Sequence, residues 1–119
     1  MIRIVFLTML LLVGCSAQAS EDGLQVTFNA SDDHVEAFEP VIFTAKLRYD
    51  GSPIKNGAEI EFEFINPQGQ SLGSVIPTNT GDGAYTIETS FDLVGTYKVI
   101  AHVTYENLHE MPEVEVTLQ

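Results

Sequence analysis

Residues 92–105, DLVGTYKVIAHVTY, contain the longest alternating segment of the sequence. Apolar and polar side chains alternate along it. Every second residue is apolar: Tyr97, Val99, Ala101, Val103 and Tyr105. A period of two is typical of a β-strand with one buried face and one solvated face. The stretch therefore predicts a long strand over residues 95–105.

Six other segments show the same alternation, and no window after the first fourteen residues shows a helical period. Turn residues such as Gly81-Asp82-Gly83 separate these segments. Because each strand has one apolar face, two sheets must pack face to face. The further strands are expected near 24–30, 40–49, 57–65, 71–76, 83–91 and 113–119.

The residues Asp92, Gly95 and Tyr97 form a D-x-x-G-x-Y pattern just before the long strand. This pattern resembles the turn of immunoglobulin-like sandwiches in which a tyrosine hydroxyl bonds back to the backbone. The alternative is that Tyr97 is simply a core tyrosine. The chain has no tryptophan and only one cysteine, so it lacks the buried tryptophan and the disulfide of antibody domains. We expect an all-β, immunoglobulin-like sandwich of about seven antiparallel strands over residues 24–119.

The N-terminus has the pattern of a bacterial lipoprotein signal. Arg3 precedes an apolar run over 4–13, which is shorter than the roughly 20 residues that span a bilayer. The run ends in Leu12-Val13-Gly14-Cys15, which resembles a lipobox, where the thiol receives a diacylglyceryl group and the peptidase needs a small residue before it. We expect a signal peptide over 1–14 and a lipidated tether over 15–23. An ordinary signal peptide that contains a cysteine is the alternative.

Lipidation would place the protein on the extracytoplasmic face of the cell membrane, because two or more acyl chains anchor stably. Cys15 is the only cysteine, so disulfides and thiol metal sites are excluded. After Cys15 the sequence has seventeen acidic and four basic residues, which gives a net charge of −13 with histidine neutral. That charge argues against nucleic acid as a partner. It fits either plain solubility or a loose attraction for cations.

No catalytic motif is present: the sequence lacks G-x-S-x-G, H-E-x-x-H, a P-loop and a dinucleotide-binding glycine pattern. Its most regular carboxylates, Glu59, Glu61 and Glu63, alternate along one strand and are typical of a solvated face. We therefore expect a protein that is not an enzyme.

Residues 101–112 concentrate metal-binding side chains. They hold His102, His109 and Met111, the last being the only methionine after Cys15. If the last two strands form a hairpin, residues 106–112 are its tip, and His102 lies on the strand about 10 Å below. Imidazole and thioether together suit copper. The alternative is an exposed loop histidine beside a methionine that packs over the sandwich end, and His34 is expected to be a solvated loop residue.

Residues 41–118 resemble a YtkA-like domain, close to the FixH-like proteins. The resemblance rests on five motifs of this chain: F-x-A-x-L, G-S-P-I-x-x-G-A-x-I, G-D-G-A-Y, D-L-V-G-T-Y-K-V-I-A-H-V-T and L-H-E-M-P. It implies an immunoglobulin-like fold and copper delivery for respiratory oxidase assembly. Its implied copper ligands are His102, His109 and Met111, and its implied partner is a membrane respiratory or copper-handling protein.

This chain departs from the family at one place. Relatives often carry further histidine and methionine before the G-D-G turn, whereas residues 70–79 have neither. Weak copper binding, or none, would follow if those residues are ligands. The alternative function is a metal-free, immunoglobulin-like interaction module at the cell surface. It would dock through a sheet face or edge, where Ile42, Ile65 and Ile100 interrupt polar faces.

We expect mass spectrometry of the protein extracted from membranes to find diacylglyceryl on Cys15, with residues 1–14 removed. A Cys15→Ser variant should leave the membrane fraction. A bare thiol on a chain that stays in the cytosol would contradict both the lipidation and the location.

Overall fold

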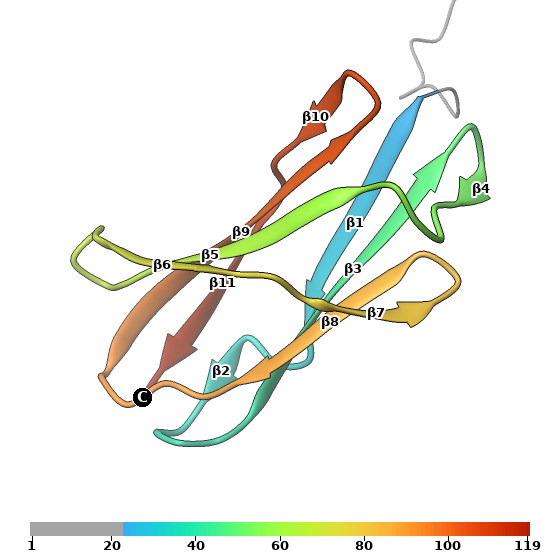
Figure 1. Cartoon of the computed structure of the whole chain (residues 1–119). Helices are drawn as coiled ribbons and strands as arrows, with labels where there is room; N and C mark the ends of the chain where they lie inside the picture. Colours follow the sequence, from blue (N-terminus) through green and yellow to red (C-terminus); the bar gives the residue numbers. More distant parts are fainter. Residues whose placement is uncertain (1–22) are drawn as a thin grey trace, which may run out of the picture.

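The structure is a computed structural model that describes residues 23–119, and all of its regular elements are strands (Figure 1). The predicted signal peptide, Cys15 and the tether up to residue 22 lie outside the described residues. No helix in the described part is long and apolar enough to cross a bilayer. The strands are β1 Leu24–Ala30, β2 His34–Val35, β3 Val41–Tyr49, β4 Ser52–Pro53, β5 Glu59–Ile65, β6 Ser71–Val75, β7 Thr78–Gly81, β8 Ala84–Thr89, β9 Gly95–Tyr105, β10 Leu108–Glu110 and β11 Glu113–Leu118.

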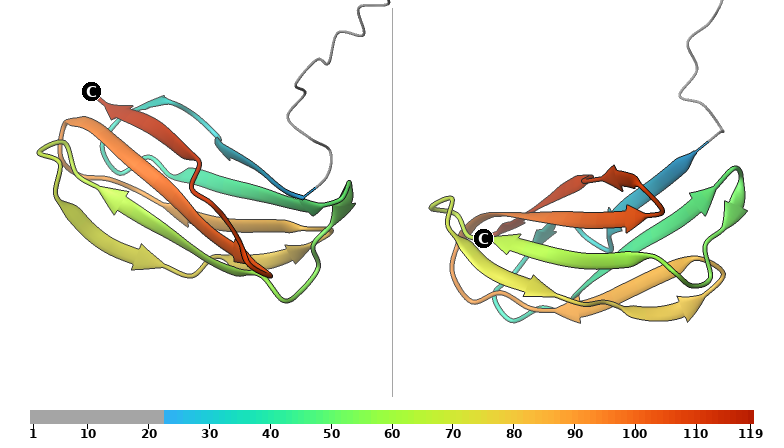
Figure 2. Two further views of the ribbon diagram at one scale, coloured as in Figure 1. Left: turned by 90° about the horizontal axis from the view of Figure 1, so that it is seen from above. Right: turned by 45° about the horizontal axis from the view of Figure 1, so that its top comes forward.

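The strands form two sheets that pack face to face, which confirms the predicted immunoglobulin-like sandwich (Figure 2). The first sheet has the order β1-β3-β8-β7, with β4 beside β3. The second has the order β2-β11-β9-β5-β6, with β10 beside β9. Every pairing is antiparallel except that of β2 with β11, which is parallel. The start of the chain therefore contributes to both sheets.

All seven predicted strands are present, and their ends differ from the predicted ends by no more than two residues. The structure adds four short strands, β2, β4, β7 and β10, of two to four residues each. Such segments are too short to show a period of two, and every residue of β7 and β10 is exposed. Their pairing depends on neighbouring strands rather than on a pattern of their own.

The core consists of the inward side chains of both sheets. On β3 the alternate residues Val41, Phe43, Ala45 and Leu47 are fully buried. Aromatic rings join the two layers: the Phe28 ring lies 4.8 Å from the Phe62 ring, centroid to centroid. Alternation along the strands thus supplies most of the interior, and Ile54 and Phe91, which lie just outside strands, add to it.

Tyr97 makes the contact that its sequence context predicts. Its ring is buried, and its hydroxyl donates a 2.9 Å hydrogen bond to the Leu93 carbonyl. Phe91 stacks on the ring at a centroid distance of 4.2 Å. Gly95, with φ of 134°, lets the chain turn into β9, and a Cβ there would lie 2.6 Å from side-chain carbons of Pro67. Only glycine fits this turn.

A Tyr97→Phe variant should lower the free energy of unfolding by about 1 kcal/mol, because it removes one hydrogen bond while the ring packing remains. The matched control is Tyr105→Phe. The Tyr105 ring packs on Tyr49, but its hydroxyl makes no hydrogen bond within residues 23–119. Urea denaturation of both variants measures the difference, and equal losses would contradict the assignment.

Candidate functional site

The histidines of the C-terminal segment lie on a continuous hairpin and not in a long loop. β10 pairs with the end of β9, and Leu108 is opposite Tyr105 while His109 is opposite Thr104. The turn is only Glu106-Asn107, with Glu106 at a positive φ of 55°. The predicted loop over 106–112 is therefore wrong, because a left-handed Glu106 closes a tight turn.

Met111 lies directly opposite His102. β11 continues the pairing with β9 in the same register as β10, and the Ala101 N–H donates to the Pro112 carbonyl at 2.9 Å. Proline has no N–H to return the bond, so the ladder is interrupted only at Met111-Pro112. The expectation that His102 lies about 10 Å below the loop is thus corrected: it is the cross-strand neighbour of Met111.

The three predicted metal ligands, His102, His109 and Met111, share the outward face of the second sheet. Side chains directly opposite each other have Cβ atoms about 5 Å apart, and diagonal neighbours lie about 7–8 Å apart. Met111 is directly opposite His102, and His109 is on the diagonal. Met111 is 64% exposed and the His102 side chain 39% exposed. The register therefore puts all three residues on one face, with His109 and Met111 on the β10 side of His102 and Glu63 on the β5 side.

Each histidine uses one ring nitrogen for a hydrogen bond on this face. His102 Nε2 donates to Glu63 Oε1 at 2.9 Å, and the Ser71 hydroxyl donates to Glu63 Oε2 at 2.7 Å. His109 Nδ1 shares a 2.9 Å hydrogen bond with the Thr104 hydroxyl. Among the described residues, His102 Nδ1 and His109 Nε2 have no partner. A histidine held at one nitrogen and open at the other is the usual arrangement of a metal ligand.

Oxygen and nitrogen ligands alone do not make a metal site here. Within residues 23–119 no three side chains of histidine, cysteine, aspartate or glutamate are grouped to hold an ion. A site on this face would therefore need the Met111 thioether. Two imidazoles and a thioether form a soft ligand set that suits Cu(I).

The third histidine of the sequence, His34, lies elsewhere. It belongs to β2, which pairs with the end of β11 near the start of β9, away from the hairpin turn, so it is in a short strand instead of the predicted loop. It is exposed, as predicted, and its Nδ1 lies 3.0 Å from Asp33 Oδ1. The hydrogen bond and charge of His34 lower the pKa of Asp33. His34 takes no part in the His102 and Met111 cluster.

The predicted apolar patch is divided between two faces. Ile65 and Ile100 lie on the outward face of the second sheet, where Ile65 is opposite Lys98 and Ile100 is opposite Glu63. Ile42 belongs to β3 of the first sheet, so it lies on the other side of the sandwich. The three isoleucines do not form one surface.

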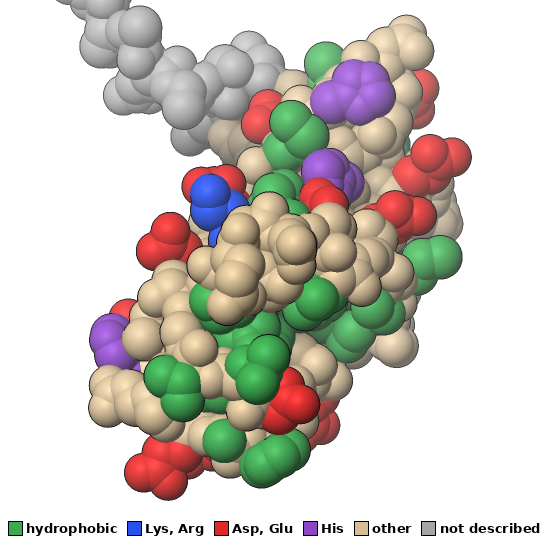
Figure 3. Space-filling model, turned by 90° about the vertical axis from the view of Figure 1, so that its left-hand side faces the viewer, with side chains coloured by type: hydrophobic (Ala, Val, Ile, Leu, Met, Phe, Trp, Pro, Cys, Tyr) green, Lys and Arg blue, Asp and Glu red, His purple; other side chains and the backbone are tan. Residues whose placement is uncertain are grey.

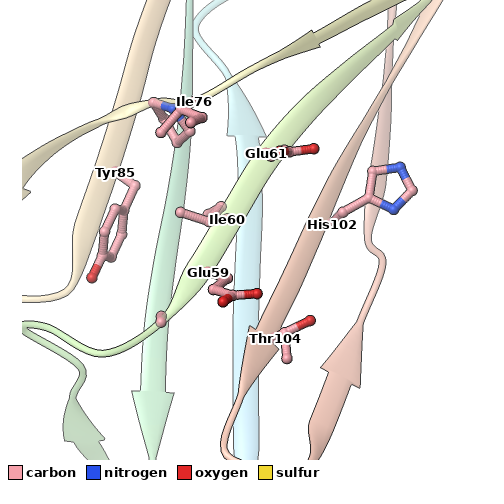
Figure 4. A pocket seen from close by; sticks show the side chains of 9 residues that line it. Glu59, Ile60, Glu61, Ile76, Tyr85, His102 and Thr104 are labelled. Carbon is pink, nitrogen blue, oxygen red and sulfur yellow. The ribbon is translucent and has the colours of Figure 1, made fainter.

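A hollow of about 540 Å³ borders this face, and the sequence did not predict it. Figure 4 shows Glu59 and Glu61 on the side of β5 that carries His102, with Ile60 and Tyr85 on the other side. The Tyr85 hydroxyl donates to the Ile54 carbonyl at 3.1 Å, and burial raises the pKa of Tyr85. The hollow is lined by Ala58, Glu59, Ile60, Glu61, Ile76, Pro77, Tyr85, His102 and Thr104.

Replacing Ser71 with alanine should raise the pKa of Glu63. The Ser71 hydroxyl, followed by His102, holds that pKa below its ordinary value by bonding to the ionised carboxylate. The lowered pKa stabilises the fold at higher pH, and this contribution is lost as pH falls through the folded pKa. NMR titration of the Glu63 carboxyl checks the shift. An unchanged pKa in Ser71→Ala would contradict it, and Ser74→Ala on the same strand is the control.

Solved structures with the same fold are distant in sequence. The Lin-41 filamin domain has a TM-score of 0.57 at 11% identity, covering 84% of this chain and 95% of that one. The PmoD soluble domain from Methylocystis sp. ATCC 49242 (Rockwell) has a TM-score of 0.54 at 13% identity, covering 86% of this chain and 95% of that one. A DUF4785 family protein from Legionella pneumophila has 0.59 at 14%, covering 80% of this chain and 28% of that one. At these identities the likeness shows the fold alone.

Curated proteins give no match to this chain. A family model does: the YtkA-like model matches residues 18–102, which is most of the sequence. The matched stretch includes Glu63 and His102 and ends before His109 and Met111. The chain therefore belongs to the YtkA-like family.

Proposed function

We propose that this protein is an exported, lipid-anchored copper-binding protein that is not an enzyme. It would hold copper on the outward face of β9 and β10 and pass it to a membrane protein, such as a respiratory oxidase during assembly or another copper-handling protein. The observation that carries the proposal is the position of Met111 directly opposite His102, with His109 on the diagonal.

The ligand atoms would be His102 Nδ1, His109 Nε2 and the Met111 sulfur. The two nitrogens are the ones that the Glu63 and Thr104 hydrogen bonds leave open. Thioether sulfur is a soft ligand and favours Cu(I), and imidazole serves both copper states. Because the side chains stand on the surface, a partner could reach the ion without unfolding the protein.

Two features of the sequence support this role. The lipobox at Cys15 would hold the domain outside the cell next to membrane proteins. The acidic surface raises the local concentration of cations around the site. Neither feature requires a buried, high-affinity metal centre.

The binding is expected to be weak. Residues 70–79 supply no histidine or methionine, and β6 is separated from β9 by β5. From that segment only the Ser71 hydroxyl reaches toward the site, through Glu63. Three protein ligands with one open position suit transfer of the ion better than storage.

The second candidate function is a metal-free interaction module. It is favoured by the 540 Å³ hollow and by the large exposed apolar side chains near it, such as Ile76, which is 74% exposed. Purification without a histidine tag, followed by metal analysis, separates the two functions.

Titration with Cu(I) should show binding that is at least about tenfold weaker in the His109→Ala, Met111→Leu double variant. Met111→Leu alone should weaken Cu(I) more than Cu(II), because it removes the soft ligand. Binding should also weaken as the pH falls, because protons compete with the metal for its ligands.

His34→Ala is the matched control, since it removes an exposed histidine that lies away from the site, and it should leave copper binding unchanged. Equal binding by the natural protein and the double variant would reject the copper proposal.

A further inference from the structure

The first half of β5 has an open edge. On one side β5 pairs with β9 along its whole length, from Glu59 opposite Thr104 to Ile65 opposite Lys98. On the other side β6 pairs with β5 only from Phe62 onward. Within residues 23–119 no strand pairs with that side of Glu59–Glu61, so this edge can accept one.

The register shows which backbone groups face the open edge. Ala101 bonds to β11 through its N–H, so the next residue, His102, bonds to β5. Its opposite residue, Glu61, therefore uses its backbone groups toward β9, and Glu59 does the same. Ile60 lies between them, so its N–H and C=O point out of the sheet edge.

The hollow lies beside this edge and provides space for a side chain of an added strand. Figure 4 shows Ile76 and Tyr85 on the same side of β5 as Ile60. In the space-filling view hydrophobic side chains gather below the two uppermost histidines (Figure 3). An added strand would place the side chain opposite Ile60 on the inward side, against the apolar lining of the hollow.

Charge identifies the occupant. Glu59 and Glu61 stand on the outward face on either side of Ile60, and neither forms an ion pair within residues 23–119. A second copy of the chain at this edge would bring like carboxylates together, which is destabilising. A basic strand would instead place a cation opposite each carboxylate.

We propose that the β5 edge binds an extended basic segment of another protein by strand addition. The segment carries lysine or arginine opposite Glu59 and Glu61 and an apolar side chain opposite Ile60 that enters the hollow. Its backbone bonds to the Ile60 N–H and C=O. His102 also lines the hollow, but the strand pairing uses none of the three proposed copper-ligand atoms, so this proposal does not rest on copper binding.

The test uses a labelled peptide, acetyl-Lys-Val-Lys-Val-Lys-amide, and the mature protein without copper. Binding is followed by fluorescence anisotropy at low salt and by hydrogen exchange of the backbone amides. We expect the peptide to slow exchange of the Ile60 amide. The same peptide with both valine nitrogens methylated keeps its charge but loses the backbone donors, and should bind about tenfold more weakly.

The Glu59→Lys, Glu61→Lys variant should also bind the peptide about tenfold more weakly, because it reverses both cross-strand pairs. The matched control is Glu113→Lys, Glu115→Lys. It makes the same change in net charge on alternate residues of β11, and should change binding by no more than about twofold. Amide spectra confirm that both variants are folded.

If both double variants lose the same amount of peptide affinity, the binding is only a general attraction between opposite charges. That result would overturn the proposal. Peptide binding without slower exchange at Ile60 would overturn it as well. The copper titration is unaffected by either result, so the two proposals fail independently.

Discussion

The structure depends on β9, which forms the centre of the second sheet. This strand pairs with β5 on one side and with β10 and β11 on the other, and neither register slips along its length. A shift of one residue would exchange every inward side chain for an outward one. The constraint therefore buries Val99 and Ala101 and, by the same parity, presents His102 and Thr104 to solvent. One face of β9 thus contributes to the core, and the opposite face carries residues of the candidate site.

The sequence predicts those parts of the structure that leave a pattern along one strand. Alternation locates all seven long strands, and the spacing of Gly95 and Tyr97 predicts the bond from the Tyr97 hydroxyl to Leu93. Parity alone places His102 on an outward position of its strand, whereas His109 and Met111 were expected in a loop and lie next to that strand instead. What parity cannot give is their distance, because it depends on where the hairpin turns. The position of the turn is set by the left-handed conformation of Glu106, which its residue type does not predict.

The open edge of β5 was beyond prediction for a related reason. Glu59 and Glu61 alternate in the sequence as any solvated face would. Their importance comes from β6, which leaves β5 after Val75 and crosses through Ile76-Pro77 toward the other sheet. Where two strands separate is a property of the packed sandwich, and only the structure shows that the backbone of Ile60 is left unpaired there.

The gap in the ladder at Met111-Pro112 divides the hairpin into parts of unequal stability. β10 has three exposed residues and meets β9 beyond this gap, while β11 is held between β9 and β2. Short, exposed segments open at low free-energy cost while the rest of a protein stays folded. The tip with His109 can therefore peel from β9 while His102 stays fixed at the centre of the sheet. Such local opening would loosen one side chain of the cluster at a time and give a bound ion a stepwise way out.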